Sequence, residues 1–188
     1  GHAPIYLVML PIYWISKYVP SNLFVLQLGM IFSIFAYLLA AIQVIKLFIK
    51  MSTTTSIVIT LIAMVFGSLL LCNNTYEYGG MTYRIPYAYA NGFLFLTIYL
   101  FIKGYNASKG RFIYFIFTAL SLVFIVLSRP LEVIYLVLFV PFIVKMVIKE
   151  LKENKKGMIL NYVPAISILL IGAIIVCYMN HTRFGSIL

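Results

Sequence analysis

The feature that most constrains this chain is a series of six long apolar stretches separated by short polar segments. A helix needs about 20 mostly apolar residues to cross the hydrocarbon core of a bilayer. The chain is 64% hydrophobic and only 10% charged, and a water-soluble fold could not bury that much apolar surface. We therefore predict six membrane-spanning helices, over Leu23–Ile45, Thr55–Cys72, Tyr87–Ile102, Phe112–Leu127, Leu131–Ile148 and Ile159–Met179.

These stretches predict an all-α fold, a polytopic transmembrane helix bundle that forms one domain over residues 1–188. The earlier apolar stretch Ile5–Ile15 is too short to span and contains Pro11, so it is predicted to be an interfacial or partial helix. Small residues four apart, such as Ala88 and Gly92, predict close helix packing. The chain begins with Gly, and we interpret it as an internal fragment of a longer protein.

The basic residues divide unequally between the two ends of the predicted helices. The larger set holds Lys46, Lys50, Lys103, Lys109, Arg111, Lys145, Lys149, Lys152, Lys155 and Lys156, and the smaller set holds Lys17, Arg84, Arg129 and Arg183. Cytoplasmic segments carry the excess of Lys and Arg, so the larger set is predicted to be cytoplasmic and the N-terminal end to lie outside. Because the charge of +10 follows helix boundaries, no nucleic-acid partner is predicted.

The run from Lys149 to Lys156 is interpreted as a topology anchor, with binding of anionic lipid headgroups as the alternative. The outer set is more informative, because three of its four residues are Arg, whereas nine of the ten inner residues are Lys. The planar fork of Arg binds phosphate bidentately. Arg84, Arg129 and Arg183 are therefore predicted to bind a lipid phosphate, the alternative being that each pairs with a Glu or with bulk lipid.

The segment Ser128–Glu132 joins two apolar stretches with almost no loop. Pro130 suits the first turn of a helix, Ser128 can cap that helix, and Glu132 complements its dipole. A helix start beside Arg129 is a natural seat for a phosphate. This junction is therefore predicted to be the centre of the anion site.

Two further outer segments supply candidates for orienting a substrate. Tyr76, Glu77 and Tyr83 could line a pocket for a sugar or a headgroup, the alternative being an aromatic belt at the membrane interface. His181 could act as a base or a metal ligand, but a lone His in an outer loop favours neither. No metal site or cofactor is predicted in this chain.

Four segments resemble bacterial GT-C-type membrane glycosyltransferases. They are Gly1-His2-Ala3-Pro4 with the following apolar run, the Tyr76-Glu77 loop, Ser128-Arg129-Pro130, and the ending from Tyr178 to Ser186. The resemblance implies transfer of a sugar from a polyprenyl-phosphate carrier to a cell-envelope acceptor, at the outer face of the bacterial cytoplasmic membrane.

The resemblance also implies a catalytic acid in the first outer loop, which would lie upstream of Gly1. The chain contains no Asp, and its weak candidates for a catalytic acid are Glu77 and Glu132. Some members of the family use a divalent metal, so the full protein could require one.

Two other classes of function stay open. A transporter or flippase of a lipid-linked or anionic substrate should place ionisable groups near the middle of the membrane. The predicted spans hold Gln27, Gln43, Asn91 and a few Ser and Thr residues there, which disfavours coupled transport. A non-catalytic membrane assembly protein is the third class.

Overall fold

The computed structural model describes residues 14, 22–74, 81–128, 130–153 and 155–184, and every element within these ranges is helical. The elements are α2 (Asn22–Phe48), α3 (Thr53–Asn74), α4 (Met81–Asn106), α5 (Arg111–Ser128), the 3₁₀-helix η1 (Pro130–Phe139), α6 (Val140–Glu153) and α7 (Lys155–Phe184). The predicted all-α bundle is confirmed. The expected interfacial segment Ile5–Ile15 lies outside the described residues except for Trp14.

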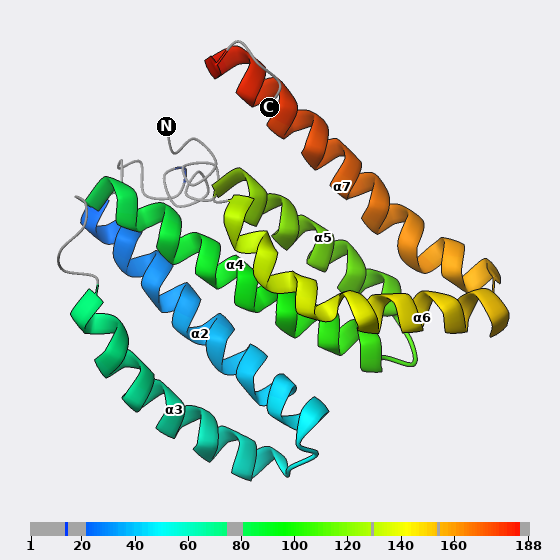
Figure 1. Cartoon of the computed structure of the whole chain (residues 1–188), viewed down its shortest axis with the longest axis horizontal. Coiled ribbons are helices and arrows are strands. Elements are labelled where there is room, and N and C mark those ends of the chain that lie inside the picture. The colour runs from blue at the N-terminus through cyan, green and yellow to red at the C-terminus, as the bar shows by residue number, and fades with distance from the viewer. Residues whose placement is uncertain (1–13, 15–21, 75–80, 129, 154, 185–188) are drawn as a thin grey trace.

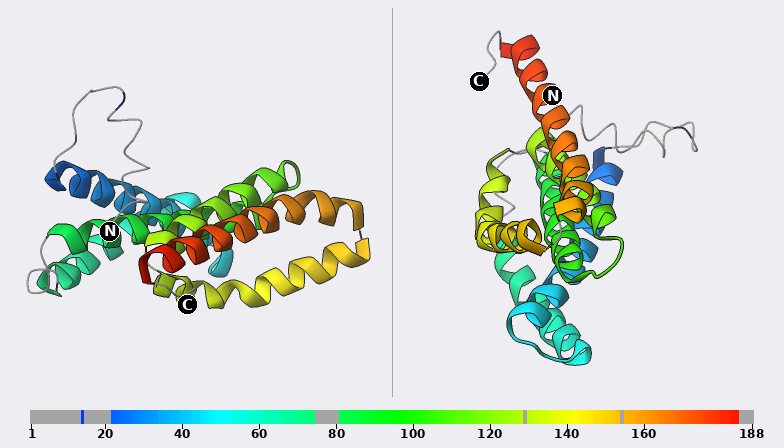
Figure 2. Two further views of the ribbon diagram at one scale, coloured as in Figure 1. Left: turned by 90° about the horizontal axis from the view of Figure 1, so that it is seen from above. Right: turned by 90° about the vertical axis from the view of Figure 1, so that its right-hand side faces the viewer.

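Successive passes of the chain run in alternating directions along the bundle, and η1 and α6 together make one pass (Figures 1 and 2). The helix α4 packs against both α2 and α5, and α5 packs against α7 on its other side. The helix α3 lies on the outside of α2, while η1 and α6 lie against α4, α5 and α7 (Figure 1). The alternation gives the bundle two distinct ends. We call them the arginine end, where α4 begins and α7 ends, and the lysine end, where α2 and α4 end.

Local sequence explains the turns at the lysine end. Lys50 has a φ of 55° and reverses the chain after α2. The Ser52 hydroxyl then accepts a hydrogen bond from the Thr55 backbone N–H at 3.2 Å, which caps the start of α3. Gly110 has a φ of 68° in the turn between α4 and α5, a conformation that glycine adopts without a steric penalty.

Glycines set the spacing between the packed helices. A Cβ atom placed on Gly29 of α2 would lie 2.7 Å from the Tyr89 ring of α4, and one on Gly92 would lie 2.4 Å from the Phe32 ring. On α7, Gly172 receives the Val123 side chain of α5 in the same way. Small residues let helix backbones approach closely in a membrane, where packing rather than water drives association.

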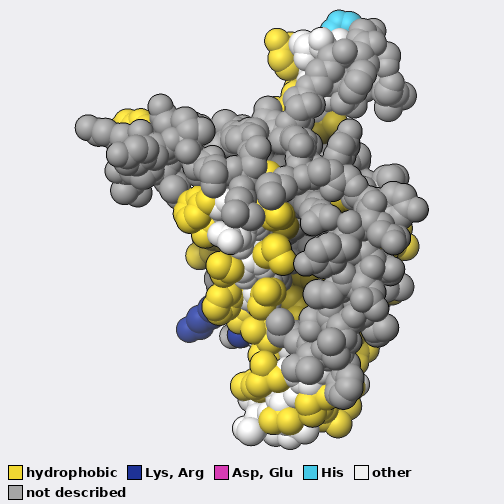
Figure 3. Space-filling view, turned by 90° about the vertical axis from the view of Figure 1, so that its left-hand side faces the viewer, with side chains coloured by type: hydrophobic (Ala, Val, Ile, Leu, Met, Phe, Trp, Pro, Cys, Tyr) yellow, Lys and Arg dark blue, Asp and Glu magenta, His cyan; other side chains and the backbone are white. Residues whose placement is uncertain are grey.

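Four of the described segments are long and apolar enough to cross a membrane, namely Phe24–Phe48, Ile85–Asn106, Arg111–Ser128 and Asn161–Met179. Large apolar side chains on their outer faces are highly exposed, with Leu170 at 61% and Ile174 at 68%. Figure 3 shows mainly hydrophobic side chains among those described at the arginine end of the molecule. Such a surface suits contact with lipid, so the chain has the structure of a helical membrane protein.

The fifth predicted span, Leu131–Ile148, differs from the expected single α-helix. It consists of the 3₁₀-helix η1 followed by the first nine residues of α6, and among the described segments it is not one of the four candidate spans. Pro141 lies in the first turn of α6, where its missing N–H costs little, so the junction allows α6 to begin as a new helix.

Candidate functional site

The residues predicted to bind a lipid phosphate belong to the arginine end. Arg84 lies in the first turn of α4, next to Tyr83, and Arg183 lies in the last turn of α7. Both positions are at the end of the bundle where α5 ends at Ser128 (Figures 1 and 2). No described contact joins them, so the clustering of these arginines stays a prediction.

The other predicted site residues are distributed as follows. Glu132 lies in η1, four residues after Ser128, where α5 ends. His181 lies in the last turns of α7 with an exposed side chain. Tyr76, Glu77 and Arg129 lie outside the described residues. The predicted sugar pocket and phosphate seat are therefore untested by the described geometry.

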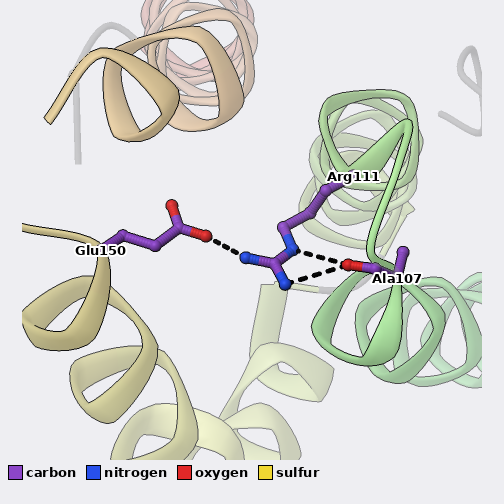
Figure 4. A network of polar contacts seen from close by, with 3 residues as sticks. All are labelled: Ala107, Arg111 and Glu150. Carbon is purple, nitrogen blue, oxygen red and sulfur yellow. Dashed lines mark hydrogen bonds and ion pairs between the residues drawn. The ribbon is translucent and has the colours of Figure 1, made fainter. Parts of the chain in front are cut away.

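The lysine end contains a buried polar network that the sequence analysis did not predict (Figure 4). The Arg111 guanidinium donates two hydrogen bonds to the Ala107 carbonyl oxygen, from Nε at 3.2 Å and from Nη2 at 2.9 Å. Its remaining arm, Nη1, forms an ion pair with Oε1 of Glu150. The Glu150 side chain is 12% exposed and that of Arg111 is 26% exposed, so the pair is largely withdrawn from solvent.

The fold explains why these three residues meet. The helix α4 ends at Asn106, and carbonyls near a helix C-terminus lack partners within the helix. Gly110 turns the chain so that Arg111, the first residue of α5, folds back onto the Ala107 carbonyl. Arg111 therefore caps the end of α4 while its charge attracts Glu150 of α6.

Tyr162 of α7 extends the network to a fourth helix. Its ring stacks on Phe115 of α5, with a centroid separation of 5.3 Å, and its hydroxyl lies within range of the Glu150 charge. The Tyr162 hydroxyl and Oε2 of Glu150 are both buried, and neither has a hydrogen-bond partner at ordinary distance among the described residues.

This network is suited to holding helices together. Arg has no accessible neutral form and serves only as a donor, and one oxygen of the Glu150 carboxylate is already engaged by it. A carboxylate buried beside a guanidinium is strongly stabilised as long as both partners remain. The network therefore fixes the α4–α5 turn to α6 and α7 at the lysine end.

The sequence did contain a signal for this network. Arg111 is the one Arg among the ten basic residues assigned to the lysine end, and the others were explained as topology signals. Arg rather than Lys is favoured where a fork must bond several acceptors at once. Glu150 belongs to the run interpreted as a topology anchor, yet it is only 9% exposed.

The described residues offer no group of three or more His, Cys, Asp or Glu side chains that could hold a metal ion. No protein-family model, curated protein or solved structure matches this chain.

Proposed function

We propose that this chain forms the membrane-embedded part of a glycosyltransferase, which takes a sugar from a polyprenyl-phosphate carrier and transfers it to a cell-envelope acceptor. The observation that carries the proposal is the alternation of helix direction. It brings the start of α4, the end of α5, the start of η1 and the end of α7 to one end of the bundle (Figure 1). These points bracket Arg84, Arg129 and Arg183 along the sequence, away from the lysines.

The chemistry of the carrier fits such an arrangement. Its polyprenyl chain is apolar and belongs in the bilayer, so its phosphate lies at the membrane surface, where the helices end. Arginines at that level would bind the phosphate bidentately and stabilise the negative charge that develops on it as the sugar leaves. In this proposal Tyr76, Tyr83 and His181 orient the sugar, together with Glu77 or Glu132.

The interior of the bundle favours this proposal over a transporter. The threonine hydroxyls of the central helices bond to carbonyls of their own helix, as Thr97 does to Phe93 at 2.8 Å and Thr118 to Tyr114 at 2.7 Å. Within the four described candidate spans, the charged residues are Lys46, Lys103 and Arg111, all near helix ends. Coupled transport would require polar or ionisable groups deeper in the membrane.

The proposal is tested by replacing Arg129 with Ala and with Lys in the complete protein, with Lys109→Ala at the lysine end as the charge-matched control. Binding of a polyprenyl phosphate and transfer from its sugar-linked form are measured for each variant. Loss of a charge-assisted bidentate contact should weaken binding by about ten- to a hundredfold in the Ala variant. The Lys variant keeps the charge without the fork and should fall between Ala and the unchanged protein.

The control should bind and react like the unchanged protein, because Lys109 is exposed in the α4–α5 turn. If Arg129→Ala and Arg129→Lys both retain full carrier binding and transfer, the phosphate role of the arginine end is wrong. A third outcome would identify a flippase instead. In that case carrier binding depends on Arg129, no sugar is transferred, and the unchanged carrier appears on the opposite side of a vesicle membrane.

A further inference from the structure

The helix α6 has an inward face that belongs to the core of the bundle. Phe142, Met146 and Glu150 are spaced four residues apart and therefore share one side of the helix. Met146 is 6% exposed and belongs to the cluster of Phe101, Ile102 and Phe115, against which Phe142 also packs. This packing fixes the rotation of α6 about its axis.

With that rotation fixed, α6 presents a stripe of lysines to the outside. Lys145, Lys149 and Lys152 recur at intervals of four and three residues, and all three are exposed. Glu150 is turned into the bundle and is paired with Arg111. Of the two glutamates next to the stripe in sequence, Glu150 is therefore already neutralised. Glu153 can offset at most one of the three lysine charges, so the stripe keeps a net positive charge.

A second outward stripe on α6 is apolar. Val140, Val144, Ile148 and Leu151 recur at intervals of four and three residues, and each is between 42% and 49% exposed. On a helical projection this stripe borders the lysines on the side away from the core face. A basic stripe beside an apolar stripe is typical of a helix at a membrane surface, where lysines meet anionic headgroups and apolar side chains meet acyl chains.

The position of α6 agrees with this pattern. The end of α6 and the start of α7 extend past the α4–α5 turn in Figure 1 and in the left view of Figure 2. The lysine stripe runs toward this projecting end of the bundle. A headgroup layer at the lysine end would therefore lie beside the last turns of α6.

We propose that the outer surface of α6 is a binding site for anionic phospholipid, with Lys145, Lys149 and Lys152 on the headgroups and the apolar stripe on the acyl chains. Charge complementarity selects an anionic over a zwitterionic lipid. The site lies at the opposite end of the bundle from the proposed carrier site and does not depend on it. The Arg111–Glu150 pair contributes by keeping the carboxylate away from the lysines.

The experiment compares two triple variants of the complete protein with equal loss of charge at the same end. One is Lys145→Gln/Lys149→Gln/Lys152→Gln on α6, and the matched control is Lys46→Gln/Lys50→Gln/Lys109→Gln, whose three lysines are also exposed. Retention of phosphatidylglycerol and of phosphatidylcholine by the purified protein in detergent is titrated for each by native mass spectrometry. A polybasic segment gains about 1 kcal/mol per Lys near an anionic membrane, so the α6 triple should bind phosphatidylglycerol at least about tenfold more weakly.

The control triple should change phosphatidylglycerol binding by less than about twofold, and neither triple should alter phosphatidylcholine binding. An equal loss in both triples would mean that bulk charge, and not α6, attracts the lipid, and would overturn the proposal. No loss in the α6 triple would do the same. If millimolar inorganic phosphate displaced the lipid completely, the site would be one for free phosphate rather than for phospholipid.

A separate variant addresses the fold of the helix. Lys145→Glu changes a single exposed side chain and reverses its charge, so it should reduce phosphatidylglycerol binding about tenfold without changing the apparent Tm. An unchanged affinity in this variant, with the Tm preserved, would also overturn the proposal.

Discussion

The two ends of the bundle are joined by different physical means. Near the arginine end, α2 and α4 meet through a neutral contact, in which the Tyr89 hydroxyl donates to the Val25 carbonyl oxygen at 3.1 Å beside the buried Ile85. At the lysine end, the α4–α5 turn meets α6 through the charged Arg111–Glu150 pair. A neutral contact loses little when one partner is removed, whereas a buried charge left alone is costly. The lysine end is therefore more sensitive to single substitutions than the arginine end.

The largest expected effect is that of Arg111→Leu. This change leaves Glu150 buried without a partner and also uncaps the Ala107 carbonyl, so the free energy of unfolding should fall by about 3–5 kcal/mol. Arg111→Lys keeps the charge but lacks the planar fork that bonds two acceptors in fixed directions, and should recover part of the loss. The free energy of unfolding of both variants and of the unchanged protein is measured in mixed micelles.

Replacing both members of the pair tests whether the stability contributed by each residue depends on the other. The double variant Arg111→Leu/Glu150→Leu should be more stable than Arg111→Leu alone, because it removes the unpaired charge. Additive losses in the double variant would show that the two residues do not interact, and would contradict the difference drawn between the two ends.

An intermediate effect is expected from overpacking the contact between α2 and α4 near the arginine end. In Gly29→Leu the new side chain would meet the Tyr89 ring, because even a Cβ atom at position 29 lies 2.7 Å from it. The free energy of unfolding should fall by about 1–3 kcal/mol. The double variant Gly29→Leu/Tyr89→Ala tests whether the clash with the Tyr89 ring causes this fall. Its loss of unfolding free energy should be smaller than the sum of the losses of the two single variants.

The smallest effect is expected from Tyr89→Phe. It removes one neutral hydrogen bond to the Val25 carbonyl and keeps the packing of the ring against Gly29, so about 1 kcal/mol should be lost. A loss of unfolding free energy as large as that of Arg111→Leu would show that both ends depend equally on polar contacts. It would contradict the greater sensitivity expected of the lysine end.

The helices could be predicted from the sequence because membrane-spanning stretches reveal themselves by length and apolar content alone. Each of the six predicted stretches is helical. The helix α5 agrees with its prediction to within one residue at each end, whereas α4 begins six residues earlier and ends four residues later than predicted. The form of the fifth stretch could not be predicted, because hydropathy does not distinguish a 3₁₀-helix followed by α6 from one continuous helix.

The polar contacts were harder to predict than the helices. Glu150 stands in a run of charges, and only the packing of α6 reveals that its side chain turns inward toward Arg111 while its lysine neighbours face outward. Periodicity gives the faces of a helix but not which neighbour each face meets. The arginine-end site stays a prediction, since Arg129 and Glu77 lie outside the described residues.

The unequal burial of the membrane helices has a consequence for how the protein is made. Among the four candidate spans, α7 is the most apolar and the least buried, whereas α4 is the least apolar and the most buried. A strongly apolar segment can leave the translocon for lipid by itself, while a less apolar one gains from neighbours that cover its polar groups. The central helix, α4, should therefore enter the bilayer with α2 already in place, and α7 should need no such companion.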